Sequence, residues 1–135
     1  TVYAMKDADG ANLDRIQLIK GWVDSNGKTH EEIINVAWSG DRKPDSNGLL
    51  PAVGNTVDLK TAKYTNNIGA ATLMGSWTDK NFDPEQHAFY YARALEIPTP
   101  RWSTYDAVRN NLPLLEDVAA TIQERAWSSP IWYKP

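Results

Sequence analysis

The sequence has 135 residues, a formal net charge of −3 at pH 7 and no cysteine. This length suits one domain with a single core, so we predict that residues 1–135 form one domain. The scattered lysines and arginines form no basic stripe, which argues against a nucleic-acid partner, and the lack of cysteine excludes a disulfide framework and a thiolate metal site.

The first residues, TVYAMKDADG, begin with Thr instead of Met and open directly on a strand-like run. They lack the charged-then-apolar order of a signal peptide, and no apolar run approaches the roughly 18 residues of a membrane helix. We therefore expect no membrane span, and we expect the chain to be cut from a longer protein.

A hairpin is predicted next. Residues 13–24, LDRIQLIKGWVD, alternate imperfectly and are rich in Ile, which is typical of a strand. Ser25, Asn26 and Gly27 supply residues that tolerate a tight turn. Extended character resumes over residues 29–38, so the two segments should pair in antiparallel fashion.

The middle of the chain is interrupted by turn residues. Residues 40–55 carry several Gly and Pro breaks and read as a long loop. Two short strands are predicted after it, in TVDLKTAKY (56–64) and IGAATLMGSW (68–77). Residues 121–133 alternate until Pro130 interrupts them, which favours a strand at a sheet edge.

Two short helices are predicted. Asp83 as N-cap and Pro84 at the first helical position indicate one turn at residues 83–87, and Ser103 or Thr104 could cap a helix over 103–110. Between them, residues 88–97 are better strand formers than helix formers, with a helix as the alternative. The fold class is therefore mainly β: an antiparallel β-sandwich-like domain with one or two short helices. We expect its core to include Ile16, Trp22, Trp38, Trp77, Tyr91 and Trp127.

Neither metal nor nucleophile chemistry has support in the residue pattern. His30 and His87 are the only histidines, and neither has a carboxylate or second histidine at ligand spacing. The segment DADGANLD lacks the third ligand and the final glutamate of an EF-hand, which favours a solvated turn. No Gly-x-Ser-x-Gly elbow or nearby histidine activates a serine. We expect no catalytic residue, metal or cofactor in this segment.

The segment PTPRW is the strongest candidate for a site. Pro98 and Pro100 fix φ angles and stiffen the loop, so the Arg101 guanidinium could make bidentate contacts with a carboxylate or phosphate. The structural alternative is an ion pair with Glu96 or Glu124. Trp102 is the tryptophan expected to face a ligand, because the other five lie in predicted strands, where large aromatics fill cores.

Four long phrases carry a family resemblance. They are LDRIQLIKGWVDSNGKTHEEIINVAWSGDR, LPAVGNTVD, YTNNIGAATLMGSWTDKNFDPEQHAFYYARALEIPTPRWSTYDA and TIQERAWSSPIWY. Together they resemble the carboxy-terminal part of the large bacterial domain-of-unknown-function family 3604. Its proteins are similar to the polymerase-and-histidinol-phosphatase group of metal-dependent phosphoesterases, whose divalent-metal ligands lie in an upstream catalytic part. None of those ligand motifs occurs in this sequence.

The resemblance implies an exported, accessory carboxy-terminal region of a hydrolase, with the upstream catalytic part of the same chain as its partner. Residues at the rim or interface would then be Arg93, Thr99, Arg101, Trp102, Tyr105 and Arg125. A glycan- or protein-binding module is the alternative, with Trp102 and neighbouring aromatics as its contact surface. An exposed aromatic platform favours the module, and an apolar patch beside PTPRW favours docking.

Overall fold

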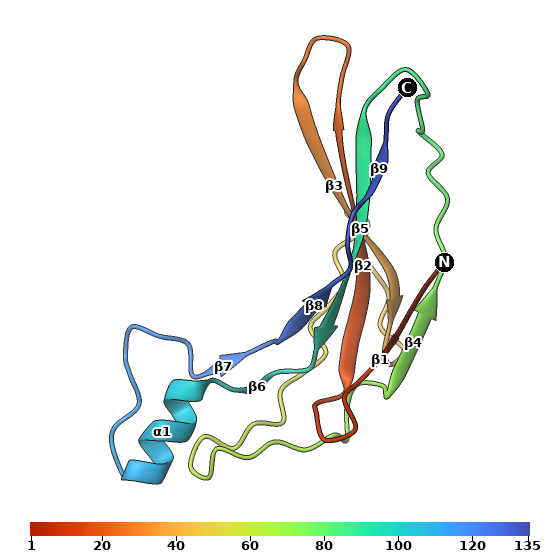
Figure 1. Ribbon diagram of the computed structural model, residues 1–135. Coiled ribbons are helices and arrows are strands. Elements are labelled where there is room, and N and C mark those ends of the chain that lie inside the picture. The colour runs from red at the N-terminus through yellow and green to blue at the C-terminus, as the bar shows by residue number, and fades with distance from the viewer.

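The computed structural model describes all residues from Thr1 to Pro135 and is mainly antiparallel β, as predicted (Figure 1). A long twisted sheet runs through the molecule, with the tip of one hairpin at one end and the only helix at the other. No helix is long and apolar enough to cross a membrane. The elements are β1 (Val2–Met5), β2 (Leu13–Val23), β3 (Thr29–Trp38), β4 (Thr72–Gly75), β5 (Ala88–Glu96), β6 (Thr99–Pro100), α1 (Trp102–Asn110), β7 (Thr121–Ile122), β8 (Arg125–Trp127) and β9 (Ile131–Tyr133).

The predicted hairpin is confirmed. β2 and β3 pair in antiparallel fashion from Val23 opposite Thr29 to the far end of the sheet. At the tip, the Asp24 carboxylate accepts hydrogen bonds from two backbone amides of the turn, and Gly27 has a φ of +77. This positive φ explains why glycine suits the position. The residues of the turn and the alternation in the two strands were therefore sufficient to predict this hairpin.

The main sheet has the strand order β3-β2-β5-β8, with β9 also pairing with β5. Residues 88–96 thus form a strand, as favoured. The predicted last strand is an edge strand, but it is split: β8 and β9 pair with different parts of β5 on either side of Pro130. Pro130 has no amide hydrogen to contribute to a ladder, which accounts for the break.

A second layer covers part of one face. β1 and β4 pair with each other and pack against β2 and β3. Leu13, Ile16 and Leu73 form the buried core between the two layers. A side chain at Gly75 would collide with the Val36 carbonyl, so glycine allows β4 to lie this close to β3. The sandwich-like part of the fold is therefore confined to the region of β1 and β4.

Two predicted elements were wrong. Residues 56–64 form turns with one isolated bridge, because the Asp58 carboxylate accepts hydrogen bonds from the Lys60 amide and the Thr61 hydroxyl at 2.9 and 2.8 Å. The predicted helix at 83–87 is also a turn. Asp83 does accept the Glu85 amide at 2.9 Å, as an N-cap would, but β5 begins at Ala88 and leaves no room for a helix.

The second predicted helix is confirmed as α1, but its cap was misassigned. Arg101 occupies the N-cap position and its side chain makes no capping bond. Thr104 lies inside the helix, fully buried, and its hydroxyl donates to the Ala120 carbonyl at 2.6 Å. The hydroxyl expected to start the helix therefore ties it to the segment that leads into β7.

The predicted tryptophan core was largely wrong. Ile16 is fully buried, but Trp127 is 58% exposed, and Trp22, Trp38, Trp77 and Tyr91 are only partly buried. The reason is that most of the sheet has a single layer, so no second sheet is present to cover large rings. The core consists instead of aliphatic residues on the central strand and its neighbours.

Candidate functional site

The PTPRW segment is held on both sides of its arginine. Thr99 belongs to β6, which pairs with β7, and its hydroxyl donates to the Ile122 carbonyl at 3.4 Å. Arg101 has extended backbone angles, and its amide donates to the Ala120 carbonyl at 3.0 Å. Since the backbone is bonded to a neighbouring segment here, the side chains that follow project from a fixed support.

Arg101 takes no part in any ion pair of the chain. Nε of Arg101 is buried and has no hydrogen-bond partner. The alternative ion pair with Glu96 or Glu124 is therefore not formed, and no carboxylate of this chain neutralises the Arg101 guanidinium. The four ion pairs that do form are Arg15–Asp14, Lys20–Asp79, His30–Asp24 and Arg42–Asp14.

Trp102 stands beside an exposed apolar patch at the helical end of the molecule. α1 ends in a Schellman motif: Asn111 adopts left-handed angles, and the Leu112 amide donates to the Ala107 carbonyl at 2.8 Å. This ending turns the chain back beside the helix. Trp102, Leu112, Pro113 and Leu115 then line a shallow hollow of about 170 Å³. We call these four residues the α1 patch.

Three large side chains of the α1 patch are mostly exposed. Trp102 is 69% exposed, Leu112 62% and Leu115 57%. Tyr105 and Arg109 lie on the same helix and contact each other, with the guanidinium carbon 5.7 Å from the ring centroid. Thr99, Arg101, Trp102 and Tyr105 thus belong to one end of the molecule.

The two remaining predicted site residues lie on the main sheet. Arg93 on β5 donates two hydrogen bonds to the Gln17 side-chain oxygen, at 3.0 and 2.6 Å. Arg125 on β8 is exposed and borders a small hollow with Lys6 and Glu124. Neither lines the hollow beside α1, so the structure does not unite all six predicted residues in one site.

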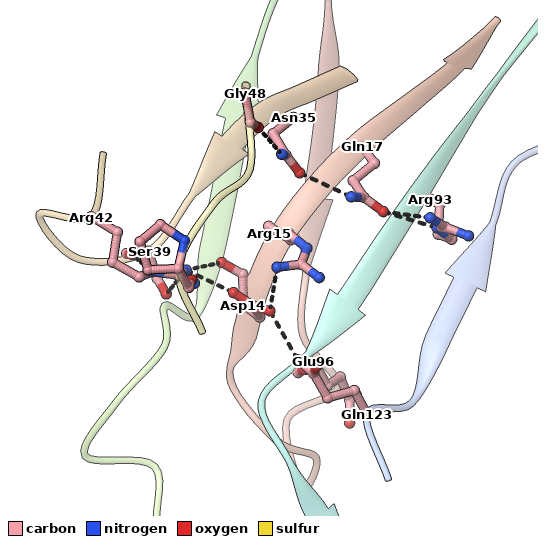
Figure 2. Close-up of polar contacts among 11 residues, drawn as sticks. Asp14, Arg15, Gln17, Asn35, Ser39, Arg42, Gly48, Arg93, Glu96 and Gln123 are labelled. Atoms are coloured by element: carbon pink, nitrogen blue, oxygen red, sulfur yellow. Dashed lines mark hydrogen bonds and ion pairs between the residues drawn. The ribbon is translucent and has the colours of Figure 1, made fainter. Parts of the chain in front are cut away.

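The polar network in Figure 2 was missed by sequence reasoning. The Asp14 carboxylate is 1% exposed and accepts hydrogen bonds from Arg42 at 2.6 Å and from the Gln123 amide at 2.8 Å, with Arg15 at 3.5 Å. Arg42 also donates to the Ser39 carbonyl at 3.1 Å. An acid near the start of an Ile-rich strand was the available signal, but Arg42 and Gln123 are distant from it in sequence.

A second set of contacts crosses the sheet in the same view. The Asn35 side chain accepts a hydrogen bond from Gln17 at 2.9 Å, and Gln17 accepts those of Arg93, so the ladder joins β3, β2 and β5 (Figure 2). The Arg93 guanidinium is therefore oriented by a neutral amide, with its charge left unpaired by any carboxylate.

Carboxylates gather where β5 ends. Burial raises the pKa of the Glu96 carboxyl above its usual range, and the nearby carboxylates of Glu124 and Asp7 raise it further, while Lys6 opposes them. Burial also raises the pKa of Tyr64, and Tyr105 and Glu96 add to that effect. No group of three or more His, Asp or Glu side chains is placed to hold a metal ion.

Comparison with known proteins gave one match. The family model described as "Protein of unknown function (DUF3604)" matches residues 1–135. No curated protein and no solved structure matches the chain.

Proposed function

The chain belongs to the DUF3604 family of proteins of unknown function, and we propose that it acts there as a non-catalytic accessory domain. In this proposal it packs against an upstream catalytic part of the same chain, a metal-dependent hydrolase related to the phosphoesterases that the family resembles. The divalent metal would be held by that catalytic part, and the protein would be exported.

The α1 patch is the observation that carries the proposal. An exposed tryptophan, two exposed leucines and a proline lie together at one end of the molecule. Clustered apolar side chains of this kind mark docking surfaces more often than isolated ones do, and a large aromatic residue commonly anchors such contacts. The patch borders the PTPRW segment, which is the arrangement expected of a docking surface.

Arg101 gives the docked surface a chemical role. Its guanidinium has no carboxylate partner in this chain, and its backbone is fixed between β6 and α1. A fixed positive charge at the rim of a cleft can neutralise an anionic substrate group without a reorganisation cost. We therefore assign Arg101 to the cleft edge and Trp102 to the contact between the two parts.

Replacing Arg101 by Ala in the full-length protein tests this function. Because no ion pair of the domain is lost, the melting temperature should stay nearly unchanged, while turnover should fall by more than about tenfold, equivalent to roughly 1.4 kcal/mol at the barrier. Arg109→Ala is the matched control, since Arg109 is an exposed arginine in the last turn of α1, at the other end of the helix from Arg101. A fall in stability with unchanged turnover per folded molecule would assign Arg101 a structural role.

Docking has its own test. Trp102→Ala in the full-length protein should loosen the contact, seen as faster amide hydrogen exchange in α1 and in the opposing surface of the catalytic part. Trp127→Ala is the control, because Trp127 is a comparably exposed tryptophan on β8. Equal exchange in both variants would argue against the patch as the docking surface.

A glycan-binding module is the second candidate function. A hollow at the end of the sheet opposite to α1 favours it.

A further inference from the structure

A larger hollow is lined by residues of the β2–β3 hairpin, of the start of β5 and of β9 near the C-terminus. These segments lie at the end of the sheet opposite to α1 (Figure 1). The volume of the hollow is about 630 Å³, within the range of about 300–1,000 Å³ typical of ligand pockets. Strands β2, β3, β5 and β9 all contribute to it. Trp132, Phe89, Glu31, His87 and Lys134 are among its lining residues. We call it the hairpin pocket.

The register of the sheet places the pocket's aromatic rings together. Gly21 on β2 pairs with Glu31 on β3 at one side and with Phe89 on β5 at the other. Phe89 in turn pairs with Trp132 on β9. Directly opposed residues project from the same face of an antiparallel sheet. The rings of Phe89 and Trp132 are 5.3 Å apart at an interplanar angle of 52°. One rung of the sheet therefore carries a carboxylate, a glycine and two aromatic rings in a row.

Gly21 determines where the Phe89 ring lies. A Cβ at Gly21 would collide with the Phe89 ring, although Gly21 has no positive φ that would call for glycine. The absence of a side chain thus lets the ring lie against the backbone of the central strand. Beside this ring, Trp132 on β9 is 72% exposed, so most of its indole surface is accessible.

Three polar side chains that line the pocket have no partner in the chain, whereas the Tyr133 hydroxyl, also in its lining, donates to the Pro84 carbonyl at 3.1 Å. Glu31, His87 and Lys134 line the pocket, and none of them makes a side-chain hydrogen bond or ion pair, unlike His30, which is bonded to Asp24 at 2.8 Å. The pocket therefore offers an unpaired carboxylate acceptor from Glu31 and an unpaired ammonium donor from Lys134. The His87 imidazole adds a ring that can donate and accept a hydrogen bond.

We propose that the hairpin pocket binds a neutral saccharide, with one sugar ring stacked on Trp132 and its hydroxyls bonded to Glu31, His87 and Lys134. The apolar face of a pyranose ring matches an exposed indole, and each hydroxyl both donates and accepts. Opposite charges on the walls disfavour a ligand with net charge of either sign. An open pocket across the end of the sheet suits one unit of a polymer, whereas a free small molecule is usually enclosed on most sides.

This site is independent of the proposed docking function. The α1 patch and the hairpin pocket lie at opposite ends of the long sheet, so a glycan and the catalytic part could be bound at once (Figure 1). The accessory domain would then tether the enzyme to a polysaccharide. The binding itself can be tested without any knowledge of the enzyme's substrate.

Calorimetric titration of the protein with three neutral pentasaccharides, cellopentaose, maltopentaose and penta-N-acetylchitopentaose, tests the site. We expect saturable binding of at least one of them. Trp132→Ala should weaken it by at least about tenfold, because the stacking surface is lost. Trp132 is largely exposed, so this variant should retain the wild-type melting temperature. Trp127→Ala is the matched control and should change affinity by less than about twofold.

A second variant and a second ligand sharpen the outcome. Gly21→Ala should displace the Phe89 ring and so lower the affinity for the same saccharide, although Trp132 is still present. Free phenylalanine, a zwitterion that could also use Glu31 and Lys134, should bind more weakly than the saccharide. The proposal is overturned by no saturable binding of any pentasaccharide, by equal weakening in Trp127→Ala, or by tighter binding of phenylalanine.

Discussion

At the scale of single residues, Asp14 and Arg42 form one of the two well-buried charge contacts in the chain, the other being Lys20–Asp79. The side chains of Asp14 and Arg42 are 1% and 13% exposed, and the closest atoms are 2.6 Å apart. A buried carboxylate is tolerated when charges and hydrogen bonds compensate it, and here two arginines and a glutamine do so. The pair also ties the loop after β3 to the central strand, because Arg42 lies in that loop and Asp14 on β2. Arg42 further donates to the Pro51 carbonyl, later in the same loop, at 2.9 Å.

Arg42→Met should lower the free energy of unfolding by about 3 kcal/mol, because it leaves the buried Asp14 carboxylate undercompensated. Urea denaturation measures the change. Lys43→Met, at the exposed neighbouring position, should change stability by less than about 0.5 kcal/mol. Asp14→Asn should cost less in the Arg42→Met background than in the wild type; additive effects would show that the pair is not coupled.

Glu96 makes stability depend on pH. Burial and the neighbouring carboxylates raise its folded pKa above its ordinary value of 4.5. Between these two values the folded state binds more protons than the unfolded state, so stability falls as pH rises through that window. Below this window Glu96 is protonated in both states and costs no stability. Above it the buried, charged carboxylate destabilises the folded state by its full amount.

Glu96→Gln should therefore raise the melting temperature at about pH 7 and leave it unchanged at about pH 4, relative to wild type. The comparison is made by thermal denaturation at both pH values. Glu116→Gln removes an equal charge from an exposed position and serves as the control. A variant that is destabilised at neutral pH would mean that the Glu96 carboxylate is stabilised in the fold.

At the scale of elements, the local chemistry of turns and caps decided where strands and helices end. Asn111 ends α1 with a φ of 51 and a ψ of 44, a conformation that costs residues with a Cβ about 1 kcal/mol or more. Asn tolerates it, and Gly does so without strain. By contrast, the Asp83 turn shows that an N-cap signal alone does not make a helix when a strand begins a few residues later.

Asn111→Gly should raise the free energy of unfolding by some tenths of a kcal/mol, and Asn111→Ala should lower it by about 1 kcal/mol. Chemical denaturation of both variants gives the comparison. Ala normally stabilises a helical position relative to Gly, so the reversed order is the diagnostic. If Ala were the more stable variant, the left-handed end of α1 would be in doubt.

At the scale of the whole molecule, the chain has its own small core, yet it exposes many large apolar side chains. Only 19 of the 135 residues are buried, and Trp102, Trp127 and Trp132 are all more than half exposed. Of the 57 backbone–backbone hydrogen bonds, 35 lie within the helix and strands. Such an extended shape offers surface at both ends, where the two proposals place a partner and a glycan.

We predict that the isolated chain folds but does not catalyse. A cooperative melting transition and a β-type far-ultraviolet spectrum are expected, because the aliphatic core is formed within the chain. Phosphomonoester and phosphodiester substrates with added divalent metal should show no turnover. Metal-dependent turnover that persists through re-purification would contradict the second part, and a chain without a cooperative melting transition would contradict the first.

The sequence by itself determined the elements that depend on neighbouring residues. The hairpin around Gly27, the strand at 88–96, the helix near 103–110 and the break at Pro130 follow from turn chemistry, alternation and the missing amide of proline. The family followed from long matching phrases, and the family model covers the whole chain. Trp102 was singled out because the other five tryptophans lie in predicted strands; it begins α1 and is 69% exposed, and its contact with a ligand stays a prediction.

Only the tertiary structure decided what depends on segments far apart in the chain. Alternation shows that a strand has two faces, but it does not show whether a second layer covers them, which is why the tryptophans predicted to be core are partly or largely exposed. Asp14 meets Arg42 and Gln123, and Phe89 meets Trp132, through pairings set by the sheet's register. Arg101 lacks an ion pair for the same reason: proximity in space to Glu96 or Glu124 is a property of the packed chain, not of residue spacing.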